Sequence, residues 1–152
     1  MELVNKTEYA DNFDGRLNEE IYQLSQSESL VIFTTMFGEI ESSFYSFTEN
    51  HWFVQADSQC VGRWIEAYNL DENSSVSLAL KESVKWKEDA DIYFCASRLI
   101  VFKTTWRNFV KNWDAFLACE DDCPILIQDL DQREAFMFTP MGEIRYIKKS
   151  AK

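Results

Sequence analysis

The stretch TTWRNFVKNWDAFLA, residues 104–118, decides the fold class of this chain. Its apolar residues recur three, four and seven positions apart, which is the spacing of one face of an amphipathic helix. Thr104 or Thr105 can cap the start of this helix, and Pro124 follows its end. We therefore expect an amphipathic helix over Thr104–Leu117. Its buried face would consist of Trp106, Phe109, Val110, Trp113, Phe116 and Leu117.

Short apolar segments flank this helix on both sides and are typical of strands. Two precede the helix and are joined by Ser97-Arg98, a spacing that favours a hairpin. Three follow it, separated by turn-like joints. The order strand, strand, helix, strand, strand, strand predicts an α+β fold, in which one helix crosses an antiparallel sheet. The five segments are IYFCA (92–96), LIVFKT (99–104), PILIQ (124–128), AFMFT (135–139) and EIRYI (143–147).

The first half of the chain is expected to be mainly helical. Asp14 or Asn18 can cap a helix that runs to Leu24, and the apolar residues of Asp57–Leu70 recur at helical spacing. The segment LVIFTTMF (Leu30–Phe37) is the exception, because its β-branched and aromatic residues favour a buried strand. Residues 40–47 also show helical spacing, and residues 51–55 are ambiguous.

A further helix is expected to begin at Asn73-Ser74-Ser75, with Val76, Leu80 and Val84 on its buried side. A chain of 152 residues has the length of one domain. We therefore predict a single domain over residues 1–152, in which the helical half 1–75 packs on the sheet of residues 76–152.

The net charge of −11 is unevenly distributed. Residues 1–75 hold 14 acidic and 3 basic side chains, a balance of −11, whereas residues 76–152 hold 12 of each. Such a balance excludes direct binding of nucleic acid, which requires a cationic surface. Two explanations stay open: the excess serves solubility, or it forms an acidic face for a basic partner.

Nothing in the sequence predicts a catalytic residue, a metal or a cofactor. His51 is the single histidine, the four cysteines form no C-x-x-C pair, and no glycine-rich phosphate loop occurs. Lys103, Arg107 and Lys111 are expected to lie on the polar side of the 104–117 helix and to balance charge only locally. The absence of a secretory signal and of a long apolar run predicts a cytoplasmic protein with reduced thiols and no membrane contact.

Three motifs carry a resemblance to a known family. VKWKEDADIYFC (84–95), TTWRNFVKNWDAFL (104–117) and EDDCPILI (120–127) resemble an uncharacterised gammaproteobacterial family of unknown function. The resemblance implies a shared fold and no particular reaction. The size, acidity and lack of a catalytic set are also similar to immunity proteins of contact-dependent growth inhibition systems, a likeness of class that implies a toxin inhibitor.

We therefore expect a cytoplasmic immunity protein, not an enzyme, that covers the active-site cleft of a cognate basic toxin, most simply a nuclease, with carboxylates. The alternatives are a regulatory or housekeeping binding module and a small enzyme that uses paired carboxylates. The expected toxin-binding residues form two patches. The first is Glu39, Glu41 and Glu49 with Phe44, Tyr45 and Trp52, and the second is Glu66, Asp71 and Glu72.

Overall fold

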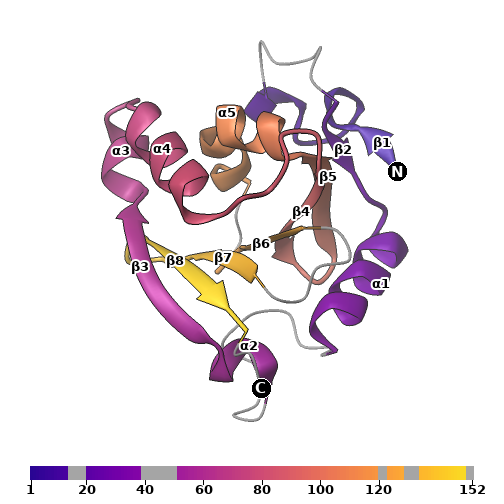
Figure 1. The fold of residues 1–152 in the computed structure, drawn as a ribbon. Coiled ribbons are helices and arrows are strands. Elements are labelled where there is room, and N and C mark those ends of the chain that lie inside the picture. The colour runs from indigo at the N-terminus through magenta and orange to yellow at the C-terminus, as the bar shows by residue number, and fades with distance from the viewer. Residues whose placement is uncertain (14–19, 39–50, 120–122, 129–133, 150–152) are drawn as a thin grey trace.

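Eight antiparallel strands form one sheet in the computed structural model, in the order β1-β2-β5-β4-β6-β7-β8-β3 (Figure 1). The structure describes residues 1–13, 20–38, 51–119, 123–128 and 134–149. The strands are β1 (Glu2–Leu3), β2 (Tyr22–Gln23), β3 (Asp57–Arg63), β4 (Asp91–Ser97), β5 (Ile100–Thr105), β6 (Ile125–Gln128), β7 (Glu134–Phe138) and β8 (Glu143–Lys148). The helices are η1 (Val4–Lys6), η2 (Ala10–Phe13), α1 (Gln26–Phe37), α2 (Trp52–Gln55), α3 (Ile65–Asn69), α4 (Ser74–Ser83) and α5 (Trp106–Leu117).

The predicted α+β fold and its central order of strands and helix are confirmed. β4 and β5 form the expected hairpin, and β6, β7 and β8 follow as an antiparallel meander. Thr105 caps α5, since its side chain accepts a hydrogen bond from the backbone N of Asn108 at 3.2 Å. α5 bends at Asn112, which has non-helical backbone angles and donates from its side chain to the carbonyl of Asn108 at 2.8 Å. The predicted apolar stripe of α5 is buried throughout.

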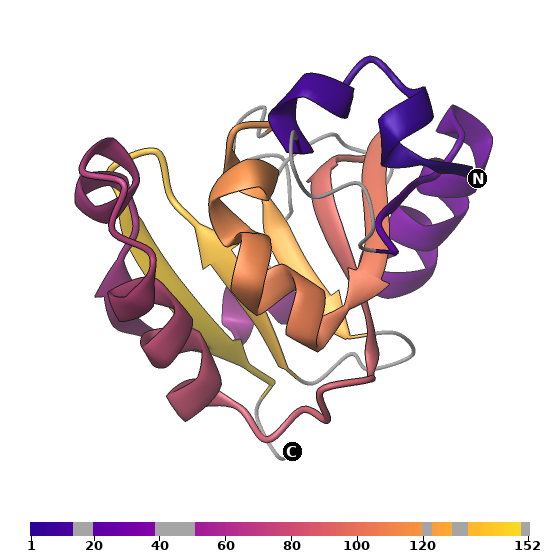
Figure 2. The same ribbon diagram turned by 90° about the horizontal axis from the view of Figure 1, so that it is seen from above.

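Helices cover both faces of the sheet (Figure 2). Side chains on a strand alternate between its faces, so β4, β5, β6, β7 and β8 each contribute side chains to two cores. Phe94 and Phe136 pack with α4 and α5 on one face, together with the N-terminal residues Val4 and Phe13. The second core lies on the other face, where Tyr93 and neighbouring strand residues pack with α1 and α2. The single crossing helix of the sequence prediction is thus one of several helices that cover the sheet.

The expected strand at Leu30–Phe37 is wrong, because these residues belong to α1. Ser25 and Glu28 form a capping box, with Ser25 Oγ accepting from the backbone N of Glu28 at 3.1 Å and Glu28 Oε1 accepting from the backbone N of Ser25 at 2.9 Å. The helix ends at Gly38, whose φ of 69° is the left-handed conformation that glycine favours. The capping box and Gly38 favour a helix here more strongly than the β-branched and aromatic residues between them favour a strand.

The first half is less helical than expected, since it contributes both edge strands of the sheet. The predicted helix ending at Leu24 is wrong over residues 20–24, which include β2; residues 14–19, like 40–47, lie outside the described ranges. Asp57–Leu70 is not one helix, because Asp57–Arg63 is β3 and only Ile65–Asn69 is helical. β3 pairs with β8, where Asp57 lies opposite a lysine and Arg63 opposite a glutamate. The predicted helix from Asn73 is confirmed as α4, with Val76 and Leu80 buried.

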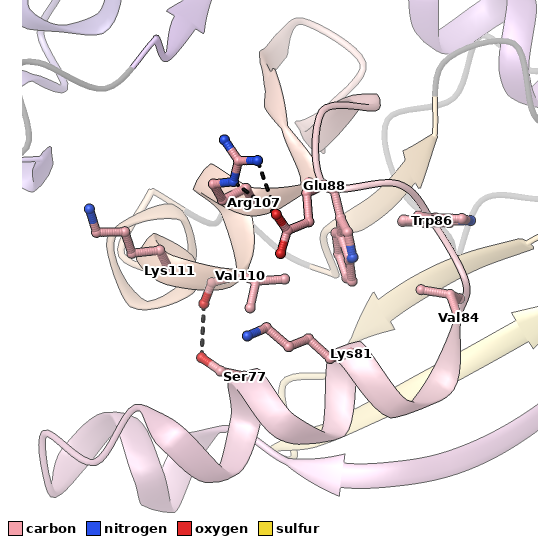
Figure 3. A pocket seen from close by; sticks show the side chains of 9 residues that line it. Ser77, Lys81, Val84, Trp86, Glu88, Arg107, Val110 and Lys111 are labelled. Atoms are coloured by element: carbon pink, nitrogen blue, oxygen red, sulfur yellow. Dashed lines mark hydrogen bonds and ion pairs between the residues drawn. The ribbon is translucent and has the colours of Figure 1, made fainter.

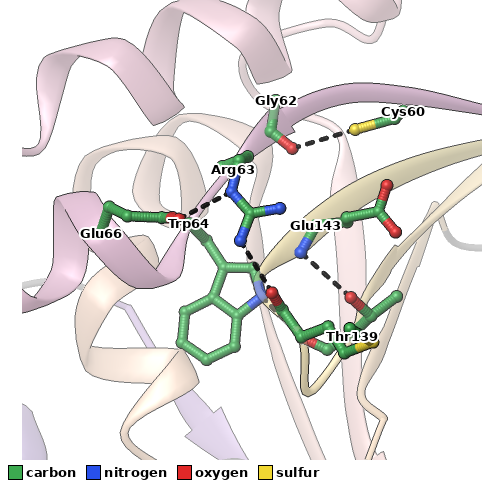
Figure 4. Close-up of polar contacts among 8 residues, drawn as sticks. Cys60, Gly62, Arg63, Trp64, Glu66, Thr139 and Glu143 are labelled. Carbon is green, nitrogen blue, oxygen red and sulfur yellow. Dashed lines mark hydrogen bonds and ion pairs between the residues drawn. The ribbon is translucent and has the colours of Figure 1, made fainter.

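Hydrogen bonds connect the corner between β3 and α3 to the turn between β7 and β8 (Figure 4). The indole Nε1 of Trp64 donates to the carbonyl of Thr139 at 3.0 Å. Arg63 donates to the carbonyl of Met141 at 2.8 Å and to the carboxylate of Glu66 at 2.7 Å. These bonds position α3, and with it the second predicted acidic patch, at the β3 edge of the sheet.

Candidate functional site

Most exposed carboxylates that the structure describes in the first half lie near one of the two edges of the sheet. The edge strands β1 and β3 are separated by the other six strands, so the two groups do not form one face (Figure 1). We name the group beside β1 and β2 the N-terminal acidic edge; it consists of Glu2, Glu8, Asp11 and Glu20. The second group, on and after β3, consists of Asp57, Glu66, Asp71 and Glu72.

The carboxylates of the N-terminal acidic edge are exposed to solvent. Its four side chains are exposed, and none of them forms an ion pair with another residue in the described ranges. Glu2 and Glu8 line one hollow of about 410 Å³. Glu28 lies next to this hollow at Ser25, but its carboxylate is occupied by the N-terminal amine at 3.0 Å and by the capping box. Four like charges at one edge repel each other and gain from a cationic partner.

Two of the three acids predicted for the second patch, Glu66 and Glu72, form hydrogen bonds within the protein. Glu72 accepts hydrogen bonds from the backbone N of Ser74 at 2.7 Å and of Ser75 at 3.1 Å, and from both hydroxyl groups, so it satisfies the start of α4. These bonds, with those of the Ser74 and Ser75 side chains largest, lower the pKa of Glu72 to about 2. The hydrogen bond from Arg63 lowers the pKa of Glu66. Asp71 is exposed and adopts a positive φ of 55°.

Trp52, predicted as an aromatic contact of the first patch, lies on α2 and is half-buried against the second core. Its indole Nε1 donates to the carbonyl of Met36 at 3.3 Å, and its ring stacks on Phe37 at a centroid distance of 6.4 Å. The ammonium of Lys149 lies 5.9 Å from the ring centroid. Trp52 therefore joins α2 to α1. The other predicted members of the first patch, Glu39, Glu41, Phe44, Tyr45 and Glu49, lie outside the described residues.

Two buried cysteines and the histidine of the described residues have structural environments. Burial raises the pKa of Cys95 and of Cys119 to about 12, which leaves these thiols protonated and unreactive at neutral pH. His51 caps α2: its Nδ1 accepts from the backbone N of Phe53 at 3.0 Å, and its Nε2 contacts the carbonyl of Phe37. In the described ranges, no three side chains of the metal-binding types gather into a site.

In the described part of the chain, the carboxylates are at least partly exposed and the helices are short. None of the described carboxylates is buried, whereas paired carboxylates divide their roles when burial separates their pKa values. None of the described helices combines the length and the apolar character needed to cross a bilayer.

The sequence did not predict a cationic cleft between α4 and α5 (Figure 3). Lys81 reaches across from α4, and Arg107 and Lys111 lie on the opposite wall formed by α5, around a volume of about 420 Å³. Lys103, which was expected beside them, is on β5 and pairs with Asp91 at 3.8 Å. No local pattern in the sequence indicates this cleft, because Lys81 is distant in sequence from the two α5 residues.

Comparison with known proteins identifies a family and no function. A family model described as "Protein of unknown function (DUF2947)" matches residues 11–146. The match includes the three C-terminal motifs and extends through most of the acidic first half. No curated protein and no solved structure matches the chain.

Proposed function

Since the chain belongs to the family described as protein of unknown function (DUF2947), we propose its function from its charge and surface. It is a cytoplasmic immunity protein that binds a cognate basic toxin, of the nuclease class, and blocks it without chemistry of its own. The single observation that carries this proposal is the N-terminal acidic edge, where four exposed carboxylates face solvent without an ion pair to any described residue.

The use of carboxylates elsewhere in the fold supports this reading of the edge. Glu28, Glu66 and Glu72 stabilise helix starts or pair with a neighbouring cation, so their charge contributes to folding. The N-terminal acidic edge has no comparable contact with any residue that the structure describes, and the mutual repulsion of its carboxylates lowers stability in the free protein. A basic partner relieves that repulsion on binding and associates faster because the two fields are complementary.

The nuclease class follows from the same electrostatic argument. A nuclease presents cationic side chains to the phosphates of its substrate. An inhibitor that covers this cleft with carboxylates occupies the same cations and excludes the nucleic acid by charge. Glu39, Glu41 and Glu49 stay part of the proposed contact surface together with Phe44 and Tyr45, although all five lie outside the described residues. Their segment is bounded by Phe37 and His51, which contact each other on the second core.

Co-expression with the product of the adjacent upstream gene tests this proposal. We expect the two proteins to co-purify at low salt, the complex to weaken at high salt, and this chain to restore growth to cells that produce the neighbour alone. A neighbour without toxicity, or a complex indifferent to salt, would contradict the proposal. Those outcomes would favour the alternative of a regulatory or housekeeping binding module whose acidity serves solubility.

A further inference from the structure

We propose that the cleft between α4 and α5 binds a small phosphate monoester that carries an aromatic group. This inference concerns a different surface from the N-terminal acidic edge and does not depend on the toxin. It rests on three observations: cations from two helices line the cleft, one of them is held by an exposed ion pair that an anion can replace, and an apolar wall borders a volume suited to a small molecule.

The first observation is that cations from two helices line one cleft in an otherwise acidic protein. Lys81 extends from α4 toward α5, while Arg107 and Lys111 are one helical turn apart on α5 (Figure 3). Lys81 makes no ion pair with another residue in the described ranges. Cations that line one cleft repel one another, and an anion bound in the cleft lowers this repulsion.

The second observation is that one of these cations is held by a bond that an anion can replace. Arg107 donates from Nη2 and Nε to the same oxygen of Glu88, at 3.0 and 3.3 Å. Both side chains are more than half exposed, at 64% and 70%, and ion pairs of this kind contribute little to stability. A phosphate has several acceptor oxygens and can take the guanidinium with better geometry than Glu88.

The third observation is the apolar wall. Trp86 and Trp106 lie edge to face with ring centroids 5.0 Å apart, and Val84 and Val110 complete the lining. Trp86 is only partly buried, so part of its ring faces the cleft. The volume of about 420 Å³ falls in the range of small-molecule sites, which combine an apolar wall with a few charged groups.

Charge balance selects the ligand class. Lys81, Arg107 and Lys111 against Glu88 give the lining a net charge of 3 − 1 = +2. A phosphate monoester carries about −1.5 to −2 near pH 7 and neutralises this charge, whereas a carboxylate supplies only one negative charge. The hydroxyl of Ser77 is bound to the carbonyl of Val110 at 2.9 Å, which fixes the spacing of the two helices at the end of the cleft.

Two-dimensional NMR with phenyl phosphate as the probe tests the proposal on the full chain. The indole N–H signal of Trp86, assigned with Trp86→Phe, and the backbone amides of Ser77, Lys81 and Lys111 should shift together on titration. We expect a dissociation constant below about 1 mM. Benzoate and phenol, which share the ring but carry one negative charge or none, should each bind at least about tenfold more weakly.

Four variants separate ligand binding from folding. Lys81→Gln and Arg107→Gln should each weaken phenyl phosphate binding at least about fivefold, and Lys148→Gln, an exposed lysine on β8, should leave it unchanged. Glu88→Gln should tighten binding, because it releases Arg107 and removes the negative charge; loss of folding cannot produce such a gain. Absence of shifts at millimolar phenyl phosphate, shifts away from the cleft, or weaker binding by Glu88→Gln would each overturn the proposal.

Discussion

The backbone N of Trp64 donates a hydrogen bond to the carbonyl of Gly142 at 2.8 Å, and this bond joins the end of β3 to the turn before β8. Gly142 has a φ of 96°, and a Cβ atom there would lie 2.4 Å from Cγ2 of Ile65 and 2.9 Å from Nη2 of Arg63. The position therefore needs glycine both for its backbone conformation and for the close approach of α3.

Gly142→Ala is expected to destabilise the protein by at least about 2 kcal/mol, because left-handed strain adds to a steric clash in a packed corner. Urea unfolding followed by circular dichroism measures this loss. Gly38→Ala is the matched control, since Gly38 also has a positive φ, of 69°, but a Cβ there would meet no atom within 4 Å. The control should lose about 1 kcal/mol. Equal losses in the two variants would show that Ile65 does not pack on this turn.

Glu72 should make stability depend on pH in the acid range. The side chains of Ser74 and Ser75 hold the pKa of Glu72 at about 2 in the folded protein, below its ordinary value of 4.5. A lowered folded pKa means that the stabilisation is complete above the ordinary value and is lost as pH falls from about 4.5 toward about 2. Thermal melts across this range should therefore show a smaller acid-induced decrease for Glu72→Gln than for the unmodified chain.

The control for this measurement is Asp71→Asn, which changes an exposed neighbouring acid that caps no helix. Its melting profile should follow that of the unmodified chain. If Glu72→Gln followed the same profile too, the proposed cap at the start of α4 would contribute nothing.

Thiol reactivity should distinguish one cysteine from the other three. Cys60 is exposed on the edge strand β3, whereas Cys95, Cys119 and Cys123 are buried. A thiol reagent should modify one group rapidly in the native protein and all four after unfolding in denaturant. Cys60→Ser should abolish the rapid reaction. A second fast-reacting thiol in that variant would mean that one of the cores opens to solvent.

The elements that the sequence predicted correctly have a clear local pattern. α5 buries a face that recurs at helical spacing, and the segments of β4 and β5 are short, apolar and joined by a tight turn. In both cases the residues that form the pattern also make the packing contacts. Local pattern and tertiary structure therefore agree, and the α+β fold follows from residues 91–148 alone.

The errors arise where composition and local end signals disagree. Leu30–Phe37 has the composition of a strand, but the capping box at Ser25 and the left-handed Gly38 form α1. Both signals are readable in the sequence as S-x-x-E at Ser25–Glu28 and a glycine thirteen residues after Ser25. β3 has no comparable signal, because an edge strand with exposed polar residues lacks the alternation that marks a half-buried strand.

Only part of the candidate site could be predicted from the sequence. The excess of acids in the first half is visible by counting, but the two sheet edges on which the described acids lie result from the pairing of β3 with β8 and of β1 with β2. That Glu72 caps α4 depends on hydrogen bonds that the charge count does not contain. The cationic cleft requires the packing of α4 against α5, which no local pattern specifies.

The rate of association with the product of the adjacent upstream gene, measured as a function of salt, tests the central claim most directly. The rate for the unmodified chain should fall steeply as salt increases. Replacing Glu2, Glu8, Asp11 and Glu20 together by lysine should slow association at low salt and flatten this dependence. Reversal of Glu82 and Asp89, exposed acids of the charge-balanced half, should change it little. Equal salt dependence in all three proteins would contradict the claim that the N-terminal acidic edge attracts a basic partner.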